Sequence, residues 1–283
     1  MSLGKTVKHI RKTKNIKLKH ICGNTIDMGN YWRFEEGRIS VSADTFYQII
    51  HNLNISLDEF AFYHSNYQPD KLQQLGKQMI SAYQVLDKKK LEEIASLALN
   101  EYNQTQQIKY QHLYFVSTIY IDSINKQTIN PNHTEPLKDY LMNCEQWGYY
   151  EVSLFNNILF IFGDLDIILA LYKRMDKSFL RSTPLHRTPN EESLLATNIM
   201  TMCLHERAFS KAMEINSHIQ ALEVGERSMF ARTLQLWSKG LINKVVLNKD
   251  EGLDQINTSL KIMETLEMTS TLKMFERWKS RLI

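Results

Sequence analysis

Proline and glycine are scarce along this chain, which holds only five prolines and ten glycines among its 283 residues. Strand-rich folds need many tight turns, and proline is the residue that most strongly ends a helix. Long stretches without either residue therefore favour helices of several turns. We expect an all-α protein, and two domains, because single hydrophobic cores usually stop growing near this length.

Composition and apolar patterning favour a cytoplasmic protein outside the membrane. Hydrophobic residues make up 43% and charged residues 23% of the chain, as in ordinary globular proteins. Polar residues interrupt the longest apolar stretch, 154–172, so it cannot supply a membrane span. Residues 1–17 are charged and lack the apolar centre of a secretory signal. The odd number of widely spaced cysteines fits reduced thiols in a helical core; they are Cys22, Cys144 and Cys203.

Positive charge is concentrated near the N-terminus. Residues 1–38 carry nine Lys or Arg against three acidic residues, a net charge of +6, whereas the 25 basic and 25 acidic residues of 67–283 cancel. A positive face in residues 1–38 would suit phosphate groups. A solvated charged surface without a ligand is the alternative.

The spacing of apolar residues predicts five short helices in residues 1–65, enough for one compact module. Gly23 and Asn24 form the expected turn between the second and third helices. Asp27 is a suitable N-cap for the third helix and Ser56 for the fifth. Two short helices joined by a tight turn indicate a helix-turn-helix. The apolar positions behind this prediction are Leu3, Val7, Ile10, Leu18, Ile21, Cys22, Phe46, Ile49, Ile50 and Leu53.

Segments 27–37 and 53–60 resemble the Xre-type helix-turn-helix of the Rgg/GadR/MutR family, whose members are peptide-responsive regulators of Gram-positive bacteria. In that family a serine opens the recognition helix and an Ile-Ser-Arg-Phe-Glu-x-Gly string closes it. The sequence departs from this pattern at the serine, at Ile-Ser and at one polar helix position. Matching residues are Arg33, Phe34, Glu35 and Gly37, and departing residues are Asp27, Gly29, Tyr31 and Trp32.

The resemblance implies that the third helix enters the major groove of duplex DNA. Asn30 would then pair with adenine, and Arg33 with guanine or a phosphate. The alternative for Asn30 is a solvated helix residue without a ligand. Gly29 costs the helix about 1 kcal/mol relative to alanine, but its missing side chain would let the backbone approach DNA closely. Neighbouring cations would contact phosphates and set register without reading sequence. The implied DNA-binding residues are Lys8, Arg11, Lys12, Met28, Gly29, Asn30, Arg33 and Arg38.

Residues 66–283 follow a polar, proline-containing segment, 65–70, that we take as the domain boundary. Apolar stripes then recur in pairs at intervals of roughly 40 residues, which is typical of helical repeats. The two prolines of 128–136 predict a loop there. Helix pairs of this kind predict a tetratricopeptide-like (TPR-like) α-solenoid with a concave groove, although no consensus repeat motif is present. The clearest stripe is formed by Ala208, Ala212, Ile215, Ile219 and Leu222.

The family resemblance extends more loosely over 66–283, through segments 147–151, 154–157 and 194–198. It implies that asparagines in the groove hold a peptide backbone, since an amide side chain offers both a donor and an acceptor. Asn157 and Asn198 are the candidates, with a solvated or capping role as the alternative. Aromatic and methionine positions would line apolar pockets or pack in the core instead; they are Tyr150, Phe155, Met202, Phe230 and Trp237.

Catalytic patterns are missing from the sequence. The histidines are scattered, and His205–Glu206 lacks the second histidine of a zinc-protease helix. No phosphate-binding loop, dinucleotide fingerprint or nucleophile elbow occurs. Asp164 and Asp166 are better explained as caps of a helix beginning near Leu165 than as metal ligands. We expect neither enzymatic activity nor a cofactor or metal.

Three functions fit these observations, and we favour a sequence-specific DNA-binding transcriptional regulator that a small signalling peptide controls in quorum sensing. The alternatives are an ungated helix-turn-helix repressor whose helical domain serves only dimerisation or protein contacts, and a protein-interaction scaffold. A homodimer is expected because one small module covers only half of a palindromic DNA site. The C-terminal segment 272–278 is a candidate dimer interface.

Overall fold

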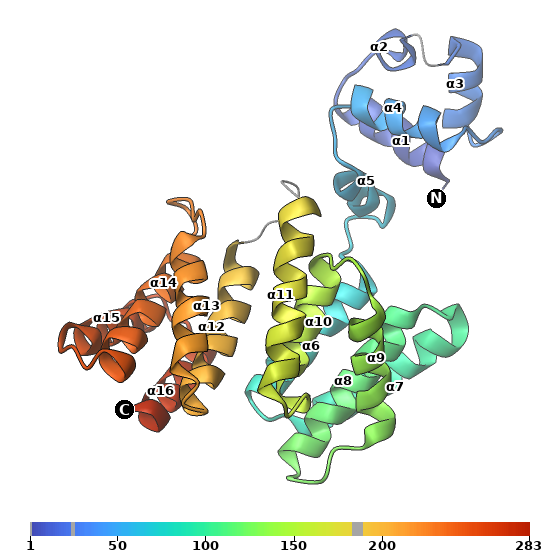
Figure 1. The fold of residues 1–283 in the computed structure, drawn as a ribbon. Coiled ribbons are helices and arrows are strands. Elements are labelled where there is room, and N and C mark those ends of the chain that lie inside the picture. Colours follow the sequence, from blue (N-terminus) through green and yellow to red (C-terminus); the bar gives the residue numbers. More distant parts are fainter. Residues whose placement is uncertain (1, 24–25, 183–188) are drawn as a thin grey trace. The chain divides into compact units, whose positions relative to one another are not determined.

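The computed structural model describes residues 2–23, 26–182 and 189–283, with side chains described outside 176–189. Helices joined by turns and loops make up these residues, and no strand occurs among them. The all-α prediction is confirmed (Figure 1). Contacts divide the chain into two units, Met1–Ala82 and Tyr83–Ile283. Within the described residues, no helix is long and apolar enough to cross a membrane.

Unit 1 contains the five helices expected from the sequence and one more. They are α1 (Leu3–Thr13), α2 (Leu18–Cys22), α3 (Met28–Glu35), α4 (Ala43–Asn52), α5 (Leu57–His64) and α6 (Lys71–Gln84), the last crossing into unit 2. The predicted caps are present: Asp27 caps α3, and Ser56 forms a capping box with Glu59 at α5. Asn24, in the expected turn between α2 and α3, lies outside the described residues.

The core of unit 1 comes from the predicted apolar positions, except Leu3, which is 46% exposed, together with the buried side of α3. Val7, Ile10, Tyr31, Phe34 and Ile49 are among its buried side chains. Because these side chains extend from three different short helices, α1, α3 and α4, burying them against each other fixes how those helices pack. The opposite side of α3 is left at the surface.

Unit 2 is built from successive helices that pack in pairs, notably α7 with α8, α12 with α13 and α14 with α15. Helix α12 also contacts both α10 and α14, and we call these three helices one layer. The bounds are α7 (Lys88–Thr105), α8 (Ile108–Ile124), α9 (Pro131–Asn143), α10 (Tyr149–Ile158), α11 (Leu165–Ser182), α12 (Pro189–His205), α13 (Phe209–Ala221), α14 (Met229–Leu241), α15 (Glu251–Thr265) and α16 (Thr269–Leu282), with short helices at Leu159–Ile161 and Ile242–Val246.

The loop predicted at 128–136 is wrong in its second half, because α9 begins at Pro131. Proline is tolerated at the first position of a helix, where its missing N–H would have no acceptor within the helix. Asn130 caps this end by accepting a hydrogen bond from the Asn132 N–H at 3.0 Å. Pro136 lies inside α9. The two contact units meet after Ala82, within α6, and the boundary expected from the sequence follows residue 65.

Candidate functional site

The start of α3 is organised by Asp27. Its carboxylate accepts a hydrogen bond from the Asn30 backbone N–H at 2.9 Å, and the Asn30 side-chain amide donates to the same group. The backbone bond is the main reason that the pKa of Asp27 is lowered. A Cβ on Gly29 would lie 3.2 Å from the Asp27 Oδ1. Glycine at this position therefore leaves room for the capping carboxylate, a role that the sequence alone did not suggest.

The outer face of α3 carries four of the eight predicted DNA-binding residues at the surface. Gly29, Asn30 and Arg33 are exposed, and Met28 is 55% exposed. Lys12 on α1 and Arg38 after α3 are also exposed. Lys8 is half-buried and forms an ion pair with Glu36, whose pKa this pairing lowers.

Arg11 was predicted to contact phosphates, but the structure buries it to 9% exposure. Its Nε lies 2.6 Å from Glu35 Oε1 and its second terminal nitrogen 2.8 Å from Glu35 Oε2, while the third nitrogen donates to the Ile16 carbonyl at 3.1 Å. All three nitrogens are used inside the module. The bidentate pair ties α1 to the C-terminal end of α3. Arg11 therefore positions α3 and is withdrawn from the DNA-contact set.

The predicted peptide-binding residues of unit 2 lie on α10, α12 and α14, the three neighbouring helices of one layer. Residues far apart in sequence are thus brought onto adjacent helices. On α10 these are Tyr150, Phe155 and Asn157, on α12 Asn198 and Met202, and on α14 Phe230 and Trp237.

A pair of amides joins the first two of these helices. Asn198 Nδ2 donates to Asn156 Oδ1 at 3.0 Å, and both residues are half-buried. The backbone carbonyl of Asn157 accepts a hydrogen bond from the Tyr120 hydroxyl at 3.0 Å. Because Asn198 donates and Asn156 accepts in this pairing, the Asn198 oxygen and the two side-chain N–H groups of Asn156 are not used by it. Asn156 was missed from the sequence because only the helix register shows which of two adjacent asparagines faces α12.

Two of the aromatic candidates belong to the core and not to a groove. Phe155 and Trp237 are fully buried, the first packed edge-to-face on Trp147 at 5.1 Å and the second on Phe275 at 4.8 Å between ring centroids. A ligand cannot touch them without opening that packing. Both are withdrawn from the peptide-contact set. Tyr150, Met202 and Phe230 are half-buried and stay candidates.

Tyr150 belongs to a polar cluster between α8, α9 and α10. Its hydroxyl lies 2.8 Å from the buried His112 Nδ1, and the Lys109 ammonium lies 4.7 Å from its ring centroid. Nearby, the Tyr140 hydroxyl donates to Glu151 at 2.6 Å. Burial lowers the pKa of His112 to about 4, so the imidazole is neutral at physiological pH. The cluster therefore fixes Tyr150 without carrying a positive imidazole.

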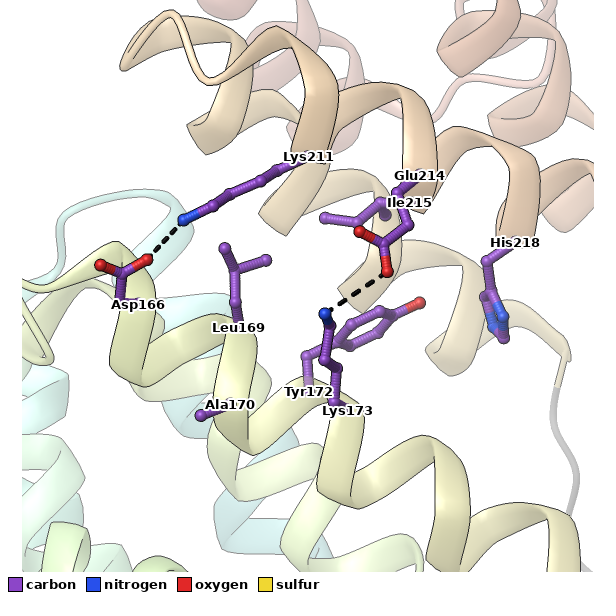
Figure 2. Close-up of a pocket in the computed structure, with 9 residues that line it drawn as sticks. All are labelled: Asp166, Leu169, Ala170, Tyr172, Lys173, Lys211, Glu214, Ile215 and His218. Carbon is purple, nitrogen blue, oxygen red and sulfur yellow. Dashed lines mark hydrogen bonds and ion pairs between the residues drawn. The ribbon is translucent and has the colours of Figure 1, made fainter.

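A cleft of about 370 Å³ lies between α11 and α13 and contains none of the predicted peptide-binding residues. Figure 2 shows ion pairs across it: Lys211 with Asp166, and Lys173 with Glu214 at 3.4 Å. Leu169 and Ile215 also line it. Exposed ion pairs of this kind contribute little to stability, and the charges on the two walls already neutralise each other.

Comparison with known proteins decides the family. Residues 96–277 match the family model described as the C-terminal domain of the HTH-type transcriptional regulator Rgg. This match covers more than half of the chain. The protein belongs to the Rgg family. The resemblance seen in the sequence is confirmed, and the protein is a transcriptional regulator by family, not an enzyme.

Solved structures show that this Rgg protein shares its fold with other regulators. The Streptococcus dysgalactiae SHP pheromone receptor Rgg2 is 21% identical over 99% of both chains, with a TM-score of 0.78. A Listeria monocytogenes regulator is 16% identical over 99% of this chain and 96% of its own, with a TM-score of 0.81. PrgX in complex with cCF10 is 11% identical over 100% of both chains, with a TM-score of 0.69. The prediction of a helix-turn-helix followed by TPR-like helical repeats is confirmed.

Proposed function

We propose that this Rgg protein regulates transcription by binding DNA sequence-specifically through unit 1, under the control of a small signalling peptide bound by unit 2. The DNA half of the proposal depends on one observation: the exposed face of α3 presents Met28, Asn30 and Arg33 in a segment of net charge +6. Lys12 and Arg38 flank that face as phosphate contacts. Arg33, which is long and cationic, is the main candidate for reading a guanine edge.

The peptide half is supported by the amide pair on α10 and α12. The Asn156–Asn198 hydrogen bond holds the Asn198 oxygen beside the N–H groups of the Asn156 amide, so the pair offers the acceptor and the donor that an extended peptide backbone needs. Half-buried Met202 and Phe230 on α12 and α14 offer apolar contacts in the same layer. The structurally similar Rgg2 is described as a pheromone receptor, and PrgX as a complex with cCF10. A peptide on this layer fits a quorum-sensing role.

The peptide would control DNA binding if it stabilised one arrangement of two DNA-binding units over another. A ligand shifts such an equilibrium only by the difference between its affinities for the two states. We expect a cytoplasmic homodimer, because one module covers a half-site only. The candidate interface at 272–278 falls on α16, where Phe275 is buried against Trp237. Lys273 and Arg277 remain exposed there for contacts with a partner.

Thermal unfolding with short synthetic hydrophobic peptides tests the peptide half of the proposal. A peptide that binds the folded chain must raise the melting temperature. We expect Asn198→Ala to lose the shift, because its amide is one of the two gripping groups. Asn103→Ala, an exposed asparagine on α7, is the matched control and should keep the shift. If no peptide raises the melting temperature of the unaltered chain, the ungated repressor becomes the better account.

A further inference from the structure

Two large apolar side chains lie side by side on the outer face of α3. Met28 is 55% exposed and Trp32 44% exposed. Residues four positions apart in a helix are neighbours on its surface, so these two form one continuous apolar strip. The strip runs beside Gly29 and Arg33, which have the same spacing. A tryptophan beside an exposed methionine on the surface of a short helix is unusual, because such residues are usually covered by a core or a ligand.

The Trp32 ring is held in place by the turn that ends α3. Gly37 adopts the left-handed conformation, with φ of 74°, and its N–H donates to the Phe34 carbonyl at 2.9 Å. The Arg38 N–H donates to the Arg33 carbonyl at 2.9 Å, which completes a Schellman motif and folds the chain back over the helix end. The Arg38 guanidinium then lies 4.8 Å from the centroid of the Trp32 ring.

This stacking has two consequences for binding. A ring that is already held loses less conformational freedom when a ligand covers it. The cation that holds it also gives the apolar strip a positive border, next to Arg33. Charge therefore favours a polyanion as the occupant, in a segment whose net charge is +6.

The major groove of DNA offers one apolar group to such a strip, the C5 methyl of thymine. Resting on the proposed function of α3, we propose that Met28 and Trp32 are specificity-determining residues that contact thymine methyl groups. The half-site then carries thymines where the strip faces the base pairs, beside the position that Arg33 reads. Arg38 serves as a positioning residue for Trp32 in addition to its phosphate contact.

Uracil substitution tests this inference, because it removes the methyl and leaves base pairing intact. Short duplexes are first selected from a random library by the full-length protein, and then remade with uracil for thymine. Burying one methyl contributes about a fourfold factor to a binding constant. We expect the unaltered protein to bind the uracil duplex several-fold more weakly. The Met28→Ala, Trp32→Ala double variant should bind both duplexes equally, and Trp32→Phe should keep part of the difference.

Tyr47→Ala is the matched control, since Tyr47 is 56% exposed on α4 of the same module. It should discriminate thymine from uracil as the unaltered protein does. Equal affinity of the unaltered protein for the two duplexes would overturn the inference while leaving DNA binding in place. Failure to select any duplex, with no affinity at low ionic strength, would overturn this inference and the proposed function together.

Discussion

Two adjacent residues of α1 show how far the role of a single charge depends on its side of the helix. Lys12 is exposed, whereas Arg11 is buried on Glu35. In the sequence both belong to one basic cluster, and both were assigned to phosphates. The sequence could not predict that Arg11 is buried, because its burial depends on its partner Glu35 at the end of α3. The buried Glu35 carboxylate would be very unfavourable without a partner, and the fold places Arg11 against it.

His112 gives the stability of the chain a defined dependence on pH. Burial lowers its pKa to about 4 from an ordinary value of 6.5. Between these values the unfolded chain binds a proton that the folded chain does not, so the free energy of unfolding falls as the pH drops through this window, by about 3 kcal/mol. Urea unfolding at several pH values measures this slope. His112→Gln should flatten it, and an unchanged slope in the variant would contradict the assignment.

At the scale of helices, the sequence predicted features that depend on nearby residues, such as helix starts, better than features that depend on contacts between helices. Asp27 and Ser56 identified the starts of α3 and α5, because capping involves only residues three positions apart. Pro136 misled the prediction of α9, since proline marks a helix boundary only on average. The seven peptide-binding candidates fell on one layer, yet their burial was not predictable. Apolar periodicity gives the buried side of a helix without showing which side chains its neighbours cover.

Glycine at the crossing of α1 and α3 offers a test of packing between elements. A Cβ on Gly4 would lie 1.7 Å from the Phe34 carbonyl oxygen, so the helices must move apart. Gly4→Ala should therefore destabilise unit 1, by about 1 to 3 kcal/mol or more. Nothing lies within 4 Å of a Cβ on Gly76 in α6, and Gly76→Ala should stabilise the chain by about 0.5 to 1 kcal/mol. Hydrogen exchange of unit 1 amides measures the stability of the two variants. A change of the same sign in both would contradict this packing.

Over the whole molecule, the two proposed sites fall in different units of the chain. The cationic α3 surface lies in Met1–Ala82, and the amide pair of α10 and α12 lies in Tyr83–Ile283. If the two proposed sites are coupled, the coupling must be reciprocal: a peptide that changes the affinity for DNA by some factor would have its own affinity changed by DNA to the same extent. The charge asymmetry of the sequence, which places the net positive charge in residues 1–38, favours a DNA site in this part of the chain.

The affinity of the full-length protein for promoter duplexes, titrated over salt concentration, tests the central claim most directly. If the α3 surface binds DNA, the logarithm of the binding constant falls linearly with the logarithm of salt concentration. Arg38→Ala should reduce that slope by about one, and Arg33→Ala should weaken binding by about 1 to 3 kcal/mol while relaxing sequence preference. Lys89→Ala, an exposed cation on α7, should change neither. No affinity at low ionic strength, or an affinity that salt does not alter, would contradict the account.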